Sequence, residues 1–385
     1  MSQATLKSRL LNWMRGAGFL YECLRTAFRT GRRCFVWTAR IILSGTRLGP
    51  PSGFFSVFGS LQSEGCFVRM VMNGQALPQL PDRSLIRDAG MNQNAHQPWP
   101  IFVASMSHVR LVGSSLCPMN DRKQLMKEAC YGDSYYREDP SFHQFISRNC
   151  ECLSGDWTSI TGRFSNGYFH WMMDDLPRLA VLGLMPPETR IVVRGPLRKY
   201  QRESLQLLGI EDRVYPAGSR HLLVERFHFS STVGMTGCSN PYAVSWLRNQ
   251  FSEQFQASEG LPKKLFVIRR GKTRGVLNQD ELAEKLAALD WVIIDLEDLS
   301  LDRQITVFAN ASHIVAEHGA ALTNLLWCRP GTKVLELCAD NFLNGCYEGI
   351  ALCVGLDHRF EIFKADRANR IHVPLDGLLE LLGGW

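Results

Sequence analysis

The regular alternation of short apolar runs with helical patterns between residues 265 and 337 most restricts how this chain can fold. Buried strands are expected at Leu265–Ile268, Trp291–Asp295, His313–Ala316 and Lys333–Leu337. Helical patterns separate them at 279–289, 301–309 and 320–327. Strands and helices that alternate in this way are typical of a parallel βαβ sheet.

The length of the chain indicates a second folding unit. A chain of 385 residues exceeds one ordinary core, and a less regular region with strand patterns at 190–193 and 222–229 comes first. We therefore expect an α/β protein with two Rossmann-like domains that face each other across a cleft. The expected order is an arm at 1–50, an α/β domain at 51–240, a linker helix at 241–262, an α/β domain at 263–365 and a tail helix at 366–385.

The positive charge of the chain is concentrated in its first 50 residues. That arm has nine basic residues and one acid, which leaves −2 for the other 335 residues of a chain whose net charge is +6. A folded body without positive charge argues against nucleic-acid binding. The arm has a partly helical apolar pattern, so it either contacts an anionic membrane surface peripherally or packs on the body.

No apolar run reaches the roughly 18 residues that would span a bilayer, and no clear secretory signal is present. The twelve cysteines are interpreted as small core residues of a reducing compartment. These observations predict a cytoplasmic protein, with possible contact of the arm to the inner face of the membrane.

Cations follow the strand at 265–268, where a parallel sheet binds ligands. Arg269, Arg270 and Lys272 lie within four residues. At the carboxyl end of a strand such side chains match phosphate oxygens in charge and geometry. The alternative is an ordinary solvated basic turn. The run is not a P-loop, because Phe266 stands where that motif needs glycine.

A second ligand-binding pattern follows the strand at 313–316. Small residues and a helix start there, so free backbone N–H groups can face an anion. Glu336, at the end of the next strand, could hold ribose hydroxyls or form a structural ion pair, and His318 is either a phosphate contact or a structural histidine. The predicted residues are Glu317, His318, Gly319, Ala320, Asn324 and Glu336.

The segment 167–179 offers acid–base chemistry. His170 and Asp174 are four residues apart and share one face of a helix, and either could remove a proton from a hydroxyl near neutral pH. Tyr168 and Trp171 offer aromatic faces for a sugar ring, and Arg178 completes the predicted acceptor-binding set. The alternative is an amphipathic core helix with a buried histidine.

Three blocks together resemble glycosyltransferase family 61: the run from Gly167 to Leu179, Arg269-Arg270-Gly271, and the run from Ala316 to Leu337. The resemblance covers about Gly162 to Leu337. It implies a GT-B arrangement, inversion at the anomeric carbon, and a nucleotide-diphosphate sugar held by the domain at 263–365. The domain at 51–240 would then face the acceptor. Without a clear membrane anchor, the chain looks more like the bacterial capsular-polysaccharide branch than the eukaryotic one.

The predicted reaction is transfer of a sugar to a hydroxyl of a glycan or another acceptor. No Asp-x-Asp pattern is present, so protein cations are expected to carry the leaving charge, with no cofactor and a dispensable metal. Two alternatives are a nucleotide-sugar or glycan-binding protein of the same fold without turnover, and a glycoside hydrolase with two carboxylates.

Overall fold

The computed structural model describes residues 53–56, 67–73, 77–89, 100–130, 150–218, 221–255, 260–270 and 274–384. The predicted arm at 1–50 and Lys272 lie outside these residues. Within them, no helix is both long and apolar enough to cross a bilayer.

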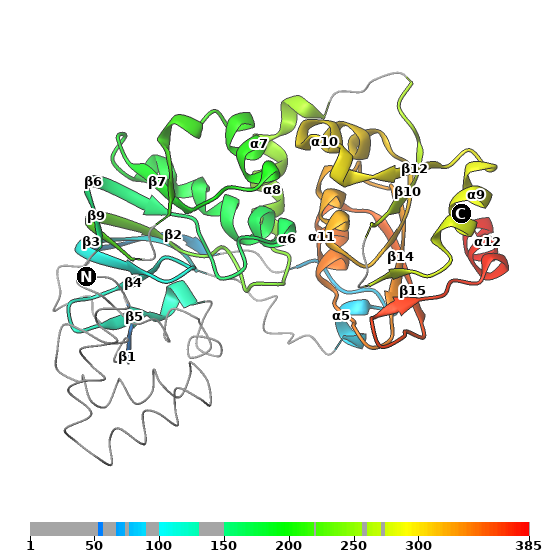
Figure 1. Cartoon of the computed structure of the whole chain (residues 1–385), viewed down its shortest axis with the longest axis horizontal. Helices are drawn as coiled ribbons and strands as arrows, with labels where there is room; N and C mark the ends of the chain where they lie inside the picture. The colour runs from blue at the N-terminus through cyan, green and yellow to red at the C-terminus, as the bar shows by residue number, and fades with distance from the viewer. Residues whose placement is uncertain are drawn as a thin grey trace, which may run out of the picture.

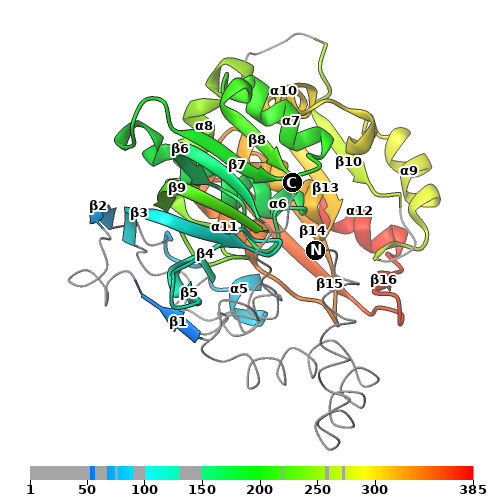
Figure 2. The same cartoon turned by 60° about the vertical axis from the view of Figure 1, so that its left-hand side comes forward.

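The first half of the chain builds a mixed sheet. Nine strands are joined in the described part, in the order β1-β5-β4-β3-β9-β6-β7-β8, with β2 on β3. Strands β3, β9, β6 and β7 lie side by side (Figure 2), and β6 is parallel to both β9 and β7. The bounds are β1 Gly53–Phe55, β2 Phe67–Asn73, β3 Pro100–Val112, β4 Cys117–Met119, β5 Gln124–Met126, β6 Glu151–Ser159, β7 Arg190–Arg194, β8 Val214–Ala217 and β9 His221–Ser230.

The second half builds a parallel sheet of five strands in the order β12-β10-β13-β14-β15. Leu265 and Val267 of β10 enter one core, whereas Phe266 between them enters another, so both faces are covered. Burial on both faces explains the uniformly apolar strands. The bounds are β10 Lys264–Ile268, β12 Val292–Asp295, β13 His313–Glu317, β14 Lys333–Ala339 and β15 Asp357–Phe363, with a separate pair of β11 Gly275–Val276 and β16 Arg370–Ile371.

Helices fill the space between the two sheets, and two more cover the outer face of the second (Figure 1). The inner ones are α6 Tyr168–His170, α7 Lys199–Leu207, α8 Pro241–Gln250, α10 Leu301–Asn310 and α11 Cys346–Val354. The outer ones are α9 Gln279–Ala287 and α12 Leu375–Gly383. Shorter turns are the 3₁₀ segments η2 Lys127–Cys130, η6 Leu176–Leu184, η7 Glu211–Arg213, η8 Ser252–Gln254, η9 Leu296–Asp298 and η10 Ala320–Trp327, and the π-helical segment η5 Trp171–Asp175.

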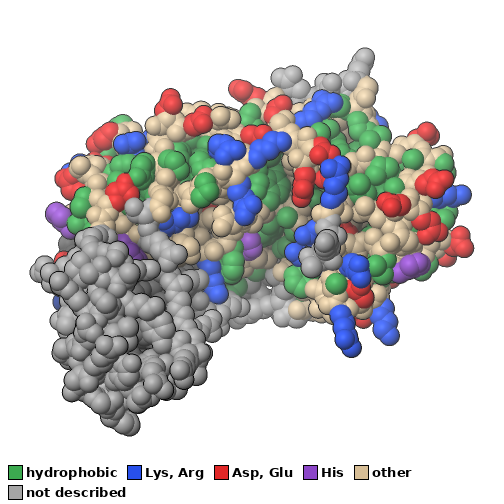
Figure 3. Space-filling view, in the orientation of Figure 1, with side chains coloured by type: hydrophobic (Ala, Val, Ile, Leu, Met, Phe, Trp, Pro, Cys, Tyr) green, Lys and Arg blue, Asp and Glu red, His purple; other side chains and the backbone are tan. Residues whose placement is uncertain are grey.

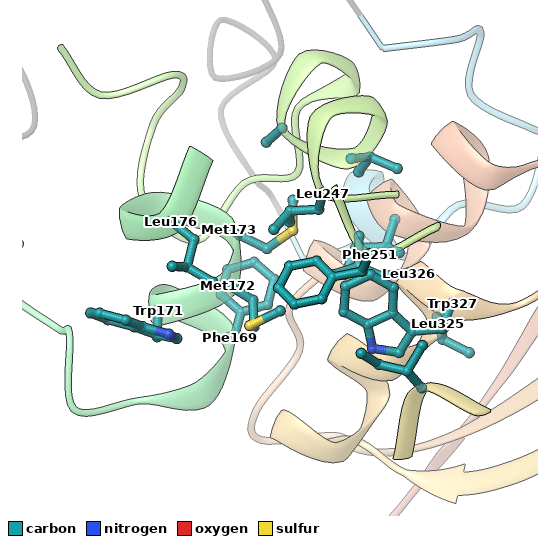
Figure 4. Close-up of a cluster of buried hydrophobic side chains, with 14 of the residues drawn as sticks. Phe169, Trp171, Met172, Met173, Leu176, Leu247, Phe251, Leu325, Leu326 and Trp327 are labelled. Atoms are coloured by element: carbon teal, nitrogen blue, oxygen red, sulfur yellow. The ribbon is translucent and has the colours of Figure 1, made fainter. Parts of the chain in front are cut away.

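One hydrophobic cluster runs through this helical layer from sheet to sheet. It joins side chains of η5, such as Met172, to Phe251 and to Trp327 of η10 (Figure 4). Ile191 of β7 and Leu265 of β10 belong to the same cluster. The two halves therefore share a core instead of burying separate ones.

The prediction of an α/β protein is confirmed, but some expected boundaries differ. The linker helix expected at 241–262 ends at Gln250, where Phe251 leaves the helical region, and the tail helix starts at Leu375, after Pro374. Pro374 favours an extended backbone before the helix and cannot continue one from upstream.

A short helix from the first part of the chain packs on the second sheet's side. In α5, Leu85–Asp88, Leu85 packs with Cys338 and Phe360 of β14 and β15. Glu348 of α11, 2% exposed, accepts hydrogen bonds from the amide of Ile86 at 2.7 Å and from Ser84 Oγ at 3.0 Å. Gly345 makes room, because a Cβ there would lie 2.6 Å from Ile86 Cα. The predicted domain at 51–240 thus does not describe this segment.

Candidate functional site

A cavity of about 400 Å³ lies where the two halves meet, at the carboxyl ends of β10, β12 and β13. The second half contributes Arg269, Arg270, Gly319 and Ala320, and the first half contributes Tyr168 and the start of α7. On the face of the molecule that Figure 3 shows, several Lys and Arg side chains lie near the middle. The volume falls in the range of small-molecule sites, and the carboxyl edge of a parallel sheet is where such folds bind ligands.

The two turns predicted to face a phosphate lie beside each other. Strands β10 and β13 pair directly, with Val267 opposite Ala316. A Cβ placed on Gly319 would lie 3.4 Å from Arg269 Nη1, so the glycine lets the guanidinium lie close to the start of η10. Arg269, about one third exposed, is therefore a cation available to a ligand in the cavity.

Arg270 is held differently from its neighbour. Its Nε lies 2.8 Å from Asp295 Oδ2, and its Nη2 lies 2.7 Å from Asp298 Oδ2. Asp295 ends β12 and Asp298 follows it shortly after, so both acids neutralise Arg270 at the rim of the cavity. Of the two predicted cations that the structure describes here, Arg270 is held in close ion pairs and Arg269 is not.

Glu317 is the last residue of β13 and lines the cavity, and the pKa of its carboxyl group is unusually high. Its side chain is 9% exposed, and among the described residues the nearest cation is Arg269, with Nε 4.0 Å from Oε1. Burial raises the pKa of Glu317 to about 7, although Arg269 and Arg274 oppose the shift. A carboxyl group with this pKa changes its charge near neutral pH.

His318 and Glu336 form a buried network across three neighbouring strands. His318 Nδ1 lies 2.5 Å from Glu336 Oε1, and His358 Nε2 on β15 lies 2.8 Å from Oε2. Burial alone would raise the pKa of Glu336, but hydrogen bonds from the two histidines lower it to about 2. Glu336 is fully buried, so the predicted contact with ribose hydroxyls is wrong, and the structural ion-pairing alternative holds.

This network includes the one group of potential metal ligands found among the described residues. Atoms of His318, Glu336 and Cys338 lie within 4.8 Å of one another. Both oxygens of Glu336, however, already accept hydrogen bonds from imidazoles. We interpret the group as a hydrogen-bonded network and not as a set of metal ligands.

Asn324 and Tyr168 are bound to each other in the wall of the cavity. The Tyr168 hydroxyl donates to Asn324 Oδ1 at 2.9 Å, and Trp327 Nε1 donates to the same oxygen at 3.0 Å. The Asn324 amide nitrogen donates to Gln304 and to a backbone carbonyl. Asn324 is therefore saturated by the protein, and Tyr168 lies on the side predicted for the donor.

His170 and Asp174 form the expected pair. His170 Nδ1 lies 2.7 Å from Asp174 Oδ2, and Thr236 Oγ1 donates to the same oxygen at 2.6 Å. His170 is 28% exposed, whereas Asp174 is 4% exposed. Asp174 lies within η5, a π-helical turn, and such turns often occur at functional sites.

The pair lies beside the cavity and does not line it. Tyr168, two residues earlier, is in the wall. Phe169 packs edge-on against Tyr347 at 5.8 Å, and Tyr347 contacts the ring of His318 at 5.0 Å. The imidazole of His170 is thus separated from His318 by two aromatic rings.

Trp171 and Arg178 correct the predicted acceptor-binding set. Trp171 is 0% exposed, and its Nε1 donates to Ser204 Oγ at 2.8 Å. Arg178 is also buried, with Nε and Nη2 both donating to the Ser230 carbonyl. Since both side chains are buried, neither can touch an acceptor in this structure. The prediction was wrong because the periodicity of 168–178 does not tell which face of the helix enters the shared core.

Trp171→Phe is therefore expected to lower the free energy of unfolding by about 1–2 kcal/mol, through loss of one hydrogen bond and some packing, without changing the KM for an acceptor. Urea unfolding and steady-state kinetics measure the two effects. Trp157→Phe is the matched control, since Trp157 is buried in a different cluster and its Nε1 also donates a hydrogen bond. A raised acceptor KM at unchanged stability would contradict the core assignment.

Several residues of the site escaped the sequence reasoning. Thr236 contacts both His170 and Asp174, and Lys199 and Tyr200 line the cavity. Lys199 and Tyr200 follow β7, so the rule that ligands meet the carboxyl ends of strands would have found them if it had been applied to the first sheet. His358 carried no pattern, because its role depends on pairing between β14 and β15.

Comparison with known proteins supports the resemblance for the middle of the chain. The family model described as Glycosyltransferase 61 matches residues 168–335. This stretch contains the hydrogen-bonded pair of His170 and Asp174, Arg269 and the Glu317–Gly319 turn. The glycosyltransferase 61 resemblance is thereby confirmed for these residues.

The curated relatives come from animals. An EGF domain-specific O-linked N-acetylglucosamine transferase of Drosophila melanogaster is 32% identical over 144 residues, 34% of this chain and 26% of that protein. A protein O-linked-mannose beta-1,4-N-acetylglucosaminyltransferase 2 of Takifugu rubripes is 34% identical over 90 residues, 22% of this chain and 15% of that protein. The chain thus matches about a quarter or less of the length of these relatives, and they give no support to the expected bacterial capsular branch.

Proposed function

We propose that the glycosyltransferase 61 segment at 168–335 makes this chain an inverting glycosyltransferase that moves a sugar from a nucleotide-diphosphate sugar to a hydroxyl acceptor. The acceptor is a glycan or another hydroxyl compound, and the two halves form a GT-B-like pair. The observation that carries the proposal is Arg269 beside Gly319 at the carboxyl edge of a parallel sheet, in a cavity of about 400 Å³.

In the proposed complex the diphosphate lies against Arg269 and the start of η10. A guanidinium and free backbone N–H groups stabilise the negative charge that grows on the leaving diphosphate. Tyr168 and the start of α7 close the cavity from the other half. N-Acetylglucosamine is the first sugar to test, because the relatives named above transfer it.

His170 is the proposed base. Because a carboxylate only accepts hydrogen bonds, the Nδ1–H of His170 donates to Asp174, and Nε2 is left to accept a proton. The acceptor oxygen gives its proton to Nε2 and bonds to the anomeric carbon. The bond from that carbon to the diphosphate oxygen breaks, and its electron pair leaves with the diphosphate. Attack from the opposite face inverts the centre.

The first experiment is a thermal-shift screen of the purified protein against nucleoside diphosphates and their sugars, followed by an assay of diphosphate release with and without acceptor. Stabilisation by one nucleotide and acceptor-dependent release are expected. Stabilisation without release would favour the binding-protein alternative. Since protein cations carry the leaving charge in this proposal, added EDTA should leave the rate unchanged.

Arg269→Ala should weaken binding of the selected nucleoside diphosphate about 10- to 150-fold, because charge-assisted hydrogen bonds contribute about 1.5–3 kcal/mol. Isothermal titration calorimetry measures this loss. Arg270→Ala is the matched control: it removes the same charge from the next residue, which Asp295 and Asp298 already neutralise, and should weaken binding less. Equal losses in the two variants would mean that the cavity attracts the ligand only through net charge.

A further inference from the structure

Glu317 stands in the wall between two hollows of the structure. One is the cavity proposed for the donor, and the other is a small pocket lined by Arg274, His318, Phe342 and Asn369. The residue is 8% exposed, and neither carboxyl oxygen has a hydrogen-bond partner within the described residues. Burying a carboxylate without hydrogen-bond partners costs free energy of folding, so its presence here calls for an explanation.

The charges that face this carboxyl group come from three elements. Arg269 follows β10 and lies 4.0 Å away, Arg274 precedes β11, and His318 is the first residue after the end of β13. The backbone amide of Val276 acts in the same direction, outside hydrogen-bond geometry. On the remaining sides, β14 and β16 present the apolar residues Leu337 and Ile371 to the small pocket.

Arg269 is therefore shared between Glu317 and any diphosphate in the cavity. We propose, on the basis of the proposed function, that the nucleotide-diphosphate donor binds together with one proton, which the Glu317 carboxylate takes from the solvent. The protonated carboxyl leaves Arg269 to the phosphates and offers an O–H to a phosphate oxygen. A charged carboxylate in the same wall would repel both phosphates in a poorly solvated place.

The linkage gives a definite dependence on pH. Burial raises the pKa of Glu317 to about 7 in the free protein, and a neighbouring diphosphate raises it further. Below this pKa the proton is already bound, and donor affinity is insensitive to pH. Above it each binding event takes up nearly one proton, and the Kd rises about tenfold per pH unit until the pKa of the complex is reached.

The test is isothermal titration calorimetry of the full chain with UDP-N-acetylglucosamine at pH 7 to 8, in HEPES and in Tris. These buffers differ in ionisation enthalpy, so the difference in observed heat counts the protons taken up. The phosphates of this probe are both esterified and do not titrate in this range. We expect uptake to approach one proton at pH 8 in the wild type and to vanish in Glu317→Gln, whose Kd should not depend on pH.

Glu297→Gln is the matched control, because it removes the same charge from an exposed position on the rim of the same cavity and should keep the proton uptake. Donor binding without uptake, or uptake that persists in Glu317→Gln, would overturn this inference alone. If neither this probe nor any nucleotide sugar of the thermal-shift screen binds, the proposed function fails, and this inference fails with it.

Discussion

Replacement of His170 by alanine is expected to lower turnover about 10²- to 10⁴-fold, the usual contribution of a general base, while the Kd of the donor stays within a few-fold. The reason is its position. His170 is the exposed member of the pair, and Asp174 and Thr236 both lie on its Nδ1 side, so Nε2 is the nitrogen left for an acceptor hydroxyl. Single-turnover kinetics and donor titration separate the two quantities.

Asp174→Asn is the companion variant. The buried amide keeps the size of the side chain but no longer holds the imidazole by a charge-assisted hydrogen bond, so we expect a smaller loss of rate than in His170→Ala. If both variants retain nearly normal transfer, this pair is not the acid–base centre, and the base comes from elsewhere in the chain.

Glu336→Gln is expected to lower the free energy of unfolding at pH 7 by about 3 kcal/mol. This follows from the pKa of Glu336, which is held at about 2 against an ordinary value of 4.5, since each pKa unit corresponds to about 1.4 kcal/mol. A lowered pKa in the folded state means that the stabilisation is complete above pH 4.5 and is lost as the pH falls toward 2. The difference between wild type and variant should shrink over this interval.

Urea unfolding at a series of pH values measures this difference. Glu361→Gln on β15 is the matched control, because its pair with Arg83 is largely exposed and such pairs contribute less than about 1 kcal/mol. Equal stability of wild type and Glu336→Gln at pH 7 would show that the hydrogen bonds of Glu336 to the two histidines do not stabilise the folded state.

The second half of the chain was predictable because its strands are buried on both faces. The strand expected at 265–268 is β10, Lys264–Ile268, and the one expected at 313–316 is β13, His313–Glu317. Such strands are continuous apolar runs, and the carboxyl ends of parallel strands share one edge, so Arg269 and Gly319 were expected at the same edge. Their direct proximity also depends on the strand order, which places β13 beside β10.

The rest depended on contacts that have no local pattern. No local pattern shows that β3 runs unbroken from Pro100 to Val112, with a positive φ at His108. Trp171 looked available because a helix of 168–178 has two faces, and only the shared core decides which of them is covered. The partners of Glu336 were hidden for the same reason, since His358 is 22 residues away.

The packing of α5 on α11 also has a consequence for the synthesis of the protein on the ribosome. The amide of Ile86 donates its native hydrogen bond to the carboxylate of Glu348, which is synthesised 262 residues later. At about 5–20 residues per second, synthesis of that interval takes roughly 13 to 52 seconds. During this time Leu85 and Ile86, both fully buried in the native state, have no native surface to cover them. The nascent N-terminal half therefore leaves the ribosome with an apolar segment that chaperones can bind until the last helices emerge.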